Sequence, residues 1–293
     1  MPVIALLLHA GHAHLSAPQV LRWWTWEPWV VALLLVTTAL YTLGVLRLWR
    51  SAGAGHGIAR WQAASYCAAV AALVIALISP VDALGGILFS AHMVQHELLM
   101  LVAAPLLVLG RPFVAFVWAV PSLAVLARNR PLTAAWRRLS SPLAATVLHG
   151  LALWTWHLPS LYQATLTSDA VHAAQHASFL LTAALFWWSL LHGRAGRIGY
   201  GIAVVYVFLT TIHSGALGAL LTFSPNLWYP IYGPSTAKWG LDAIEDQQLA
   251  GLIMWIPAGV ILVVLGVAMF LGWLQEAERR VAFTQSEKLK ENR

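Results

Sequence analysis

ILFSAHMVQHELLMLVAAPLLVLG, residues 87–110, contains a single charged side chain, Glu97. A helix needs about 20 apolar residues to cross the hydrocarbon core of a bilayer, so this segment predicts a transmembrane helix. Six further segments have the same character: 28–49, 60–79, 142–158, 172–192, 200–222 and 247–273. We therefore expect an all-α, polytopic integral membrane protein with about seven transmembrane helices.

The composition supports the same class of protein. The 293 residues are 60% hydrophobic and 10% charged, with a mean hydropathy of +0.72, whereas a soluble domain has about 25% charged residues. So few polar side chains cannot cover a water-soluble particle, which excludes a soluble enzyme, a nucleic-acid binder and a disordered scaffold. The lone cysteine, Cys67, excludes a disulfide within the chain and a cysteine metal cage.

The positions of Lys and Arg predict the orientation. Cytoplasmic loops are enriched in these residues, and fifteen of the seventeen fall on one side of the predicted spans, with Arg22 and Lys238 on the other. We expect an outer N-terminal segment over 1–27, a membrane domain over 28–273 and a charged cytoplasmic tail over 274–293. The apolar stretch 113–127 is too short to span and predicts an interfacial or re-entrant helix.

Twelve histidines are unusual in so apolar a chain. Under the predicted topology, six of them fall at one depth, in the outer third of the bilayer: His92, His96, His157, His172, His176 and His213. HMVQH at 92–96 and HAAQH at 172–176 each place two histidines one helical turn apart on one face. Imidazole binds copper, zinc, iron and nickel, so the two pairs predict a metal site of four nitrogens.

Other side chains near that depth suit either a role at the metal site or a structural role. Met93 and Met100 flank the first pair, and a thioether favours Cu(I), although core packing is their more common use. Glu97 and Asp246 suit metal ligands or acceptors for an imidazole N–H, and Asp246 also suits the start of the last span.

The remaining histidines favour structural roles. Imidazoles inside a membrane also form hydrogen bonds between helices, which is our interpretation of His56, His149 and His192. The N-terminal HAGHAH, at 9–14, suits a metal-capturing segment and a plain polar terminus equally. The outer loop 223–245 is rich in turn residues and suits a lid or a docking surface.

Five segments carry a resemblance to a known family: AHMVQHELLMLVAAPLLVLGRP at 91–112, WHLPSLYQATL at 156–166, HAAQHASFLLTAALFWW at 172–188, GALLTFS at 218–224 and DQQLAGLIMWIPAG at 246–259. In this order the chain resembles the CtaG family of cytochrome c oxidase assembly factors, the seven-span type associated with caa-type oxidases. The resemblance implies a multi-pass protein of the bacterial plasma membrane that helps to build haem–copper oxidase by supplying copper, with oxidase subunits as partners.

The resemblance also implies which histidines matter. The histidine positions of the family map onto His92, His96, His157, His172 and His176. Members commonly have an acidic residue where this chain has Gln175, and His213 is predicted from its depth alone.

The leading hypothesis is a copper-handling assembly factor rather than an enzyme. It would hold Cu(I) at the outer histidines and pass it to an oxidase subunit within the bilayer. A haem- or quinone-binding redox protein, a di-iron hydroxylase, a copper transporter and a metal-free assembly scaffold stay open as alternatives. The protein that would donate the copper is not indicated by the sequence.

Overall fold

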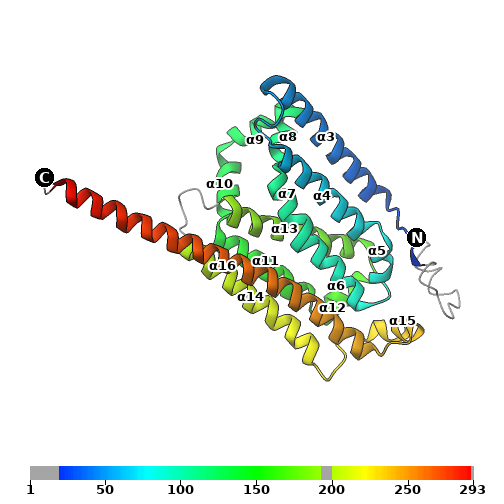
Figure 1. Ribbon diagram of the computed structural model, residues 1–293. Helices are drawn as coiled ribbons and strands as arrows, with labels where there is room; N and C mark the ends of the chain where they lie inside the picture. Colours follow the sequence, from blue (N-terminus) through cyan, green and yellow to red (C-terminus); the bar gives the residue numbers. More distant parts are fainter. Residues whose placement is uncertain (1–19, 193–199, 292–293) are drawn as a thin grey trace.

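A computed structural model describes residues 20–192 and 200–291 of the chain. This described part consists of helices and their connections, with no β-strand (Figure 1). The predicted all-α membrane fold is therefore confirmed. His9, His12 and His14 lie outside the described residues, as does most of the predicted outer segment.

The first half of the chain contains α3 (Pro28–Ala52), α4 (Arg60–Leu77), α5 (Pro80–Gly85), α6 (Phe89–Glu97), the π-helix η1 (Leu98–Ala103), α7 (Ala104–Gly110), α8 (Pro112–Ala119), the 3₁₀ turn η2 (Pro121–Leu123), α9 (Ala124–Arg128) and α10 (Arg130–Leu139). The second half contains α11 (Pro142–Trp156), α12 (Pro159–Thr165), α13 (Asp169–His192), α14 (Tyr200–Phe223), η3 (Pro230–Tyr232), α15 (Gly233–Thr236), η4 (Ala237–Trp239) and α16 (Ala243–Glu291).

Five helical stretches of the described chain are long and apolar enough to cross a membrane: Pro28–Ala52, Arg60–Leu77, Phe89–Gly110, Gly201–Phe223 and Ala243–Arg279. Two further spans were predicted, at 142–158 and 172–192. The first corresponds to α11, which has only 15 residues, and the second to α13, whose first turns read DAVHAAQH. The number seven stays a prediction.

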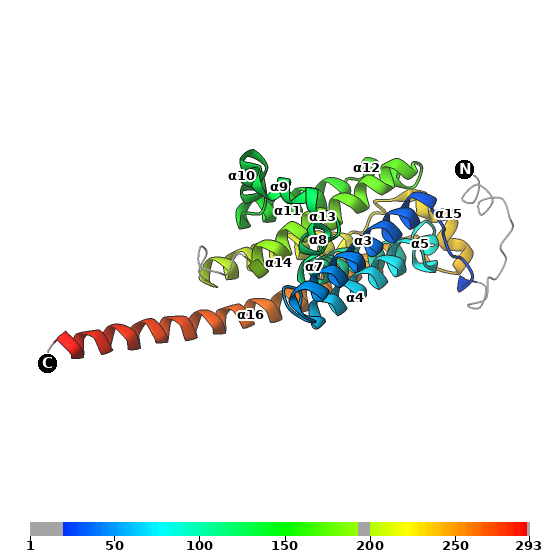
Figure 2. The same cartoon turned by 90° about the horizontal axis from the view of Figure 1, so that it is seen from above.

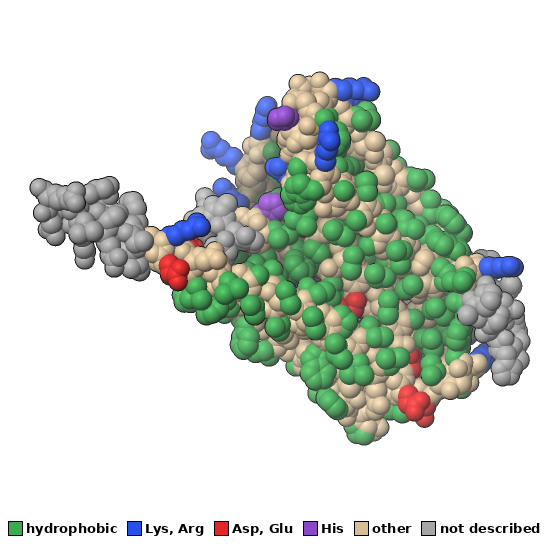
Figure 3. All heavy atoms as spheres, viewed as in Figure 1, with side chains coloured by type: hydrophobic (Ala, Val, Ile, Leu, Met, Phe, Trp, Pro, Cys, Tyr) green, Lys and Arg blue, Asp and Glu red, His purple; other side chains and the backbone are tan. Residues whose placement is uncertain are grey.

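The charged side chains divide the molecule into two ends. Lys and Arg gather around α9, α10 and the connection between α3 and α4, while the end near α5 and α15 carries few (Figure 3). This division follows the pattern used to predict the orientation. Which end faces the cytoplasm stays a prediction.

The prediction of one helix over 113–127 is wrong. Helix α8 ends at Ala119, and Val120 leaves the helical conformation with φ −131° and ψ 89° before η2 and α9 follow. The cause is Pro121, because a proline disfavours the helical conformation of the residue before it. Helix α8 packs closely on α3, where a Cβ on Gly44 would lie 1.8 Å from the Ala115 carbonyl oxygen.

The last helix passes the predicted boundary between membrane domain and tail. Helix α16 is continuous from Ala243 to Glu291, so residue 274 lies inside it. The C-terminal part of this helix projects beyond the rest of the bundle (Figures 1 and 2).

A proline also explains the π-helix η1. The N–H of Ala104 donates to the Leu99 carbonyl, five residues back, and in this register the Met100 carbonyl would require an N–H from Pro105, which has none. The indole Nε1 of Trp187 donates to the Met100 carbonyl instead, at 2.9 Å. This hydrogen bond joins α13 to the third span and fixes the two helices that carry the histidine pairs.

Candidate metal centre

The predicted histidines come together at one end of the bundle. His92 and His96 lie on α6, His157 directly follows α11, and His172 and His176 lie on α13. The short helices α5, α12 and α15 lie at the same end (Figure 1). All five imidazoles except His172 are buried.

The two i,i+4 pairs lie against each other. Within the pairs the ring centroids are 4.4 Å apart for His92 and His96 and 4.1 Å apart for His172 and His176. Between the helices, His92 lies 5.3 Å from His172 and 5.6 Å from His176. The ring of His157 lies 6.1 Å from that of His96, so it adjoins the cluster from a third helix.

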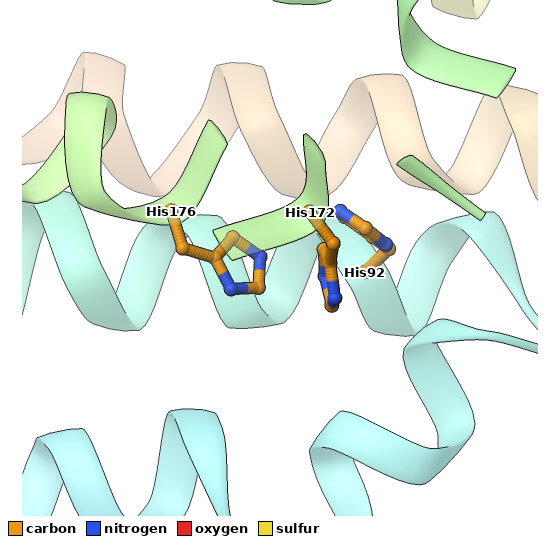
Figure 4. A group of neighbouring side chains, drawn as sticks. All are labelled: His92, His172 and His176. Atoms are coloured by element: carbon orange, nitrogen blue, oxygen red, sulfur yellow. The ribbon is translucent and has the colours of Figure 1, made fainter. Parts of the chain in front are cut away.

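Three of these residues are placed to share one ion. His92, His172 and His176 each offer one ring nitrogen, and the three nitrogens lie within 4.8 Å of one another. Figure 4 shows the two rings from α13 beside that of His92.

Five of the ten ring nitrogens in the cluster are buried without a hydrogen-bond partner. Both nitrogens of His96, and Nε2 of His157, His172 and His176, are buried without one. A buried polar atom without a partner costs about 1–3 kcal/mol, so several together require an explanation. Imidazole lone pairs that converge on one space can bind a metal ion. The donor atoms of this cluster are therefore of the right kind for a metal site.

The contacts of His92 fix its tautomer. Its Nδ1 lies 3.3 Å from the Gly85 carbonyl oxygen, and its Nε2 lies 3.2 Å from Oε1 of Gln175. A neutral imidazole has only one N–H, which Nδ1 donates to the carbonyl. The amide nitrogen of Gln175 is otherwise buried without a partner. After a half-turn of the Gln175 amide, this nitrogen donates to the lone pair on Nε2 of His92. A metal ligand at Nε2 requires this tautomer, and a bound ion would take the Nε2 lone pair in place of the Gln175 amide.

Three tyrosines close the cluster on the side of the predicted outer loop. Tyr229 donates to the His157 carbonyl at 2.7 Å, and Tyr232 donates to the Gly85 carbonyl at 2.9 Å. Since the Tyr232 proton is used there, the Tyr162 hydroxyl is the donor in its 3.0 Å contact with Tyr232. Burial raises the pKa of all three phenols, so they stay protonated donors. The loop 223–245 therefore covers the cluster.

Asp246 positions α6 and does not face the imidazoles. Its carboxylate accepts the backbone N–H groups of Phe89, at 2.7 Å, and Ser90, at 3.2 Å, and the Ser90 hydroxyl. These N–H groups belong to the first turn of α6, where a helix has no internal acceptors and favours negative charge. The capping role considered for Asp246 is thus found, but on α6 rather than on α16.

A second carboxylate, that of Asp82, contacts α6 through the side chain of Gln95. Asp82 accepts hydrogen bonds from Thr25 at 2.8 Å and from Gln95 Nε2 at 2.6 Å. Gln95 lies between the two histidines of α6 in the sequence, and its amide also donates to the Ala76 carbonyl at 2.7 Å. Burial raises the pKa of Asp82 to about 6, although both hydrogen bonds lower it.

The other predicted site residues lie outside the cluster. His213 is on α14, where its ring lies 3.4 Å from the place that a Cβ on Gly150 would occupy, and neither ring nitrogen has a partner. Glu97 and Met100 line a separate cavity. Met93 is packed in the main hydrophobic core.

Sequence reasoning did not predict which residues orient the histidines, although it singled out Gln175 as a position where family members commonly have an acidic residue. Gln95 and Gln175 occupy the same place in HMVQH and HAAQH, one residue before the second histidine, and that repeated amide was a usable signal. Gly85, Tyr229 and Tyr232 carried no such signal, because their contacts with the cluster are formed across long stretches of chain.

Fold and site together define a helical membrane protein with a cluster of five histidines, four of them buried. The chain belongs to the cytochrome c oxidase caa3 assembly factor family (Caa3_CtaG), whose family model matches residues 39–276. This membership confirms the resemblance drawn from the sequence.

Mycobacterial proteins are similar over most of the chain. Uncharacterized proteins of Mycobacterium bovis and Mycobacterium tuberculosis are each 27% identical over 278 residues, which cover 90% of this chain and 41% of theirs. An uncharacterized protein of Mycobacterium leprae is 23% identical over 92% of this chain and 42% of its own. The chain thus spans about two fifths of the length of these relatives. No solved structure matches it significantly.

Proposed function

We propose that this protein is a non-enzymatic assembly factor of the bacterial plasma membrane that binds copper at the histidine cluster and supplies it to cytochrome c oxidase. Copper is cargo in this proposal, not a resident cofactor. The observation that carries it is the meeting of five imidazoles from three helical segments, with five buried ring nitrogens that lack any partner. Family membership supplies the connection to the oxidase.

The arrangement suits capture and release of a small ion. Three ring nitrogens lie close enough to hold one ion together, and His96 and His157 offer further nitrogens beside them. Alternative ligands of the same chemistry allow an ion to change partners in small steps. Cu(I) fits this setting because imidazole is a good ligand for copper and a single charge is less costly to bury than a double one.

The packing around the rings favours an ion over haem. Phe179 lies 4.6 Å from His96, and Tyr162 lies 5.2 Å from His92, as ring centroids. These side chains fill the space beside the imidazoles that the broad plane of a porphyrin would need, and close-packed interiors do not yield such space readily.

The test is copper binding by the full chain, purified in detergent without oxygen. Cu(I) is titrated against a chromophoric Cu(I) chelator, and an absorption spectrum is recorded on the same sample. We expect copper to bind and the combined His92→Asn, His96→Asn, His172→Asn and His176→Asn variant to lose the ion held by the cluster. In cells, the same variant should lower the copper content and activity of the oxidase.

The matched control is His56→Asn, which removes an exposed imidazole distant from the cluster in sequence. It should bind copper as the unmodified chain does. Full oxidase activity with the four-histidine variant would contradict the proposal, and a haem spectrum in the purified protein would move it to the redox class. Assembly without any copper binding would favour the metal-free scaffold.

A further inference from the structure

A separate cavity of about 30 Å³ lies inside the bundle. Its polar and sulfur-bearing lining comes from helices α6, α11, α14 and α16 and from η1: Glu97, Met100, His149, Thr210, Ser214 and Met254. Since a buried water needs about 10–15 Å³ of such space, the cavity has room for about two waters or one ion.

The hydrogen bonds of His149 leave a lone pair on Nε2. Its Nδ1 lies 3.1 Å from the hydroxyl oxygen of Thr182. The Thr182 hydroxyl donates its own proton to the Ser178 carbonyl at 2.7 Å, so it accepts from His149 and Nδ1 carries the imidazole proton. A metal-binding histidine characteristically donates its other N–H to a fixed acceptor in this way.

Glu97 brings a carboxyl group without a partner into the same cavity. Its Oε2 is buried and forms no hydrogen bond, and the side chain lines the cavity. An ionisable group inside a membrane is costly and needs a counter-charge or a functional reason. A bound cation would supply the counter-charge.

Two thioethers decide which kind of cation fits. Met100 and Met254 are 5% and 3% exposed, and both residues line the cavity. Thioether sulfur is a soft ligand that selects Cu(I) over hard cations such as Mg²⁺ and Ca²⁺. The hydroxyls of Thr210 and Ser214 already donate within α14, so they face the cavity only as weak acceptors.

From this donor set we infer that the cavity is a second site for a soft monovalent metal ion, Cu(I), held by Met100, Met254 and His149 and neutralised by Glu97. The site shares no ligand with the histidine cluster. It adjoins the cluster nonetheless, because Glu97 directly follows His96 in the sequence. Leu153 also lines the cavity, and its carbonyl accepts a 2.7 Å hydrogen bond from the ring Nδ1–H of His157. An ion that leaves one site is thus next to the other site.

The test counts Cu(I) ions on the full chain by anaerobic chelator competition. The unmodified chain should bind two. The Met100→Leu/Met254→Leu double variant keeps side-chain volume and should bind one, as should His149→Asn. The matched control is Met269→Leu, because Met269 is an equally buried methionine of α16 that does not line the cavity, and this variant should bind two.

Copper binding at the cluster and copper binding in the cavity can be tested independently. The four-histidine variant of the cluster should keep one Cu(I), and X-ray absorption of that copper should show sulfur in its coordination shell. Equal stoichiometry in the double methionine variant and the unmodified chain would overturn the inference. A copper coordination shell of nitrogen and oxygen alone in the four-histidine variant would also overturn it. So would a cavity that binds no Cu(I) and holds only water beside a protonated Glu97.

Discussion

The carboxylate of Asp246 accepts a 2.7 Å hydrogen bond from the backbone N–H of Phe89, which lies 157 residues earlier in the chain. Through this bond the last helix caps the helix that carries His92 and His96. The N-terminal N–H groups of a helix lack internal acceptors and favour an anion. An acidic residue of α16 thus caps the first turn of α6, the helix that carries the first histidine pair.

Replacing this residue should loosen the cluster without removing a ligand. We expect Asp246→Ala to lower the free energy of unfolding by about 2 kcal/mol, since it leaves buried donors unsatisfied, and to weaken Cu(I) binding. Thermal unfolding in detergent and chelator competition measure the two effects. Glu245→Ala, an exposed change in the same turn, is the control and should alter neither. Unchanged copper affinity in Asp246→Ala would show that the cap does not position the histidines.

Gln175 offers a test of charge at the cluster. Its amide lies 3.2 Å from Nε2 of His92, so Gln175→Glu would place a carboxylate beside a bound cation. We expect Cu(I) binding at least about tenfold tighter, which corresponds to about 1.4 kcal/mol and is modest for opposite charges a few ångströms apart. Chelator competition measures the affinity. Gln163→Glu on α12 is the matched control, and weaker binding in Gln175→Glu would count against a cation in the cluster.

Asp82 predicts a pH dependence of stability. Its pKa is about 6 in the folded protein against an ordinary value of 3.8, because burial outweighs the hydrogen bonds from Thr25 and Gln95, and Glu27 adds repulsion. The folded state therefore holds the proton more tightly. This contribution to stability is complete below pH 3.8, falls as the pH rises to about 6, and is lost above it.

The Asp82→Asn variant cannot titrate at this position. Its unfolding temperature in detergent, measured from pH 4 to pH 7, should fall less across this window than that of the unmodified protein. Asp169→Asn, an exposed change at the start of α13, should keep the full slope. Parallel curves for Asp82→Asn and the unmodified protein would exclude Asp82 as the source.

Trp187 and Pro105 should be coupled in a mutant cycle. Trp187→Phe removes the donor to the Met100 carbonyl and should cost about 1–2 kcal/mol. Pro105→Ala supplies a backbone N–H that can reach the same carbonyl. In the Pro105→Ala background, Trp187→Phe should therefore cost less, by about 1 kcal/mol in the interaction energy. Additive effects in thermal or denaturant unfolding would mean that the indole does not replace the missing backbone bond.

Local pattern predicted much of the candidate site. Hydropathy located the long helices. The four-residue spacing placed His92 with His96 and His172 with His176 on single faces, because helical periodicity is a property of a short stretch. The structure keeps both pairs and adds His157, as the shared depth suggested.

Depth alone did not identify the neighbours of a side chain. His213 was grouped with the cluster from its depth, yet its ring lies beside Gly150. Glu97 follows His96 directly, but consecutive residues of a helix point in different directions, and Glu97 faces the second cavity. The end of the helix at Val120 could have been predicted from Pro121. The close packing of Gly44 on the Ala115 backbone, which leaves no room for a Cβ, could not have been predicted from the sequence.

By itself the sequence determined a helical membrane protein, its two histidine faces and its family, because composition, helical period and motif are all carried by neighbouring residues. Only the tertiary structure decided that the two faces meet, that Gln175 and Gly85 orient His92, and that Asp246 caps α6. The physical reason is that these contacts join separate helices, and hydrophobic faces of similar composition leave the packing order of helices open until the side chains interlock.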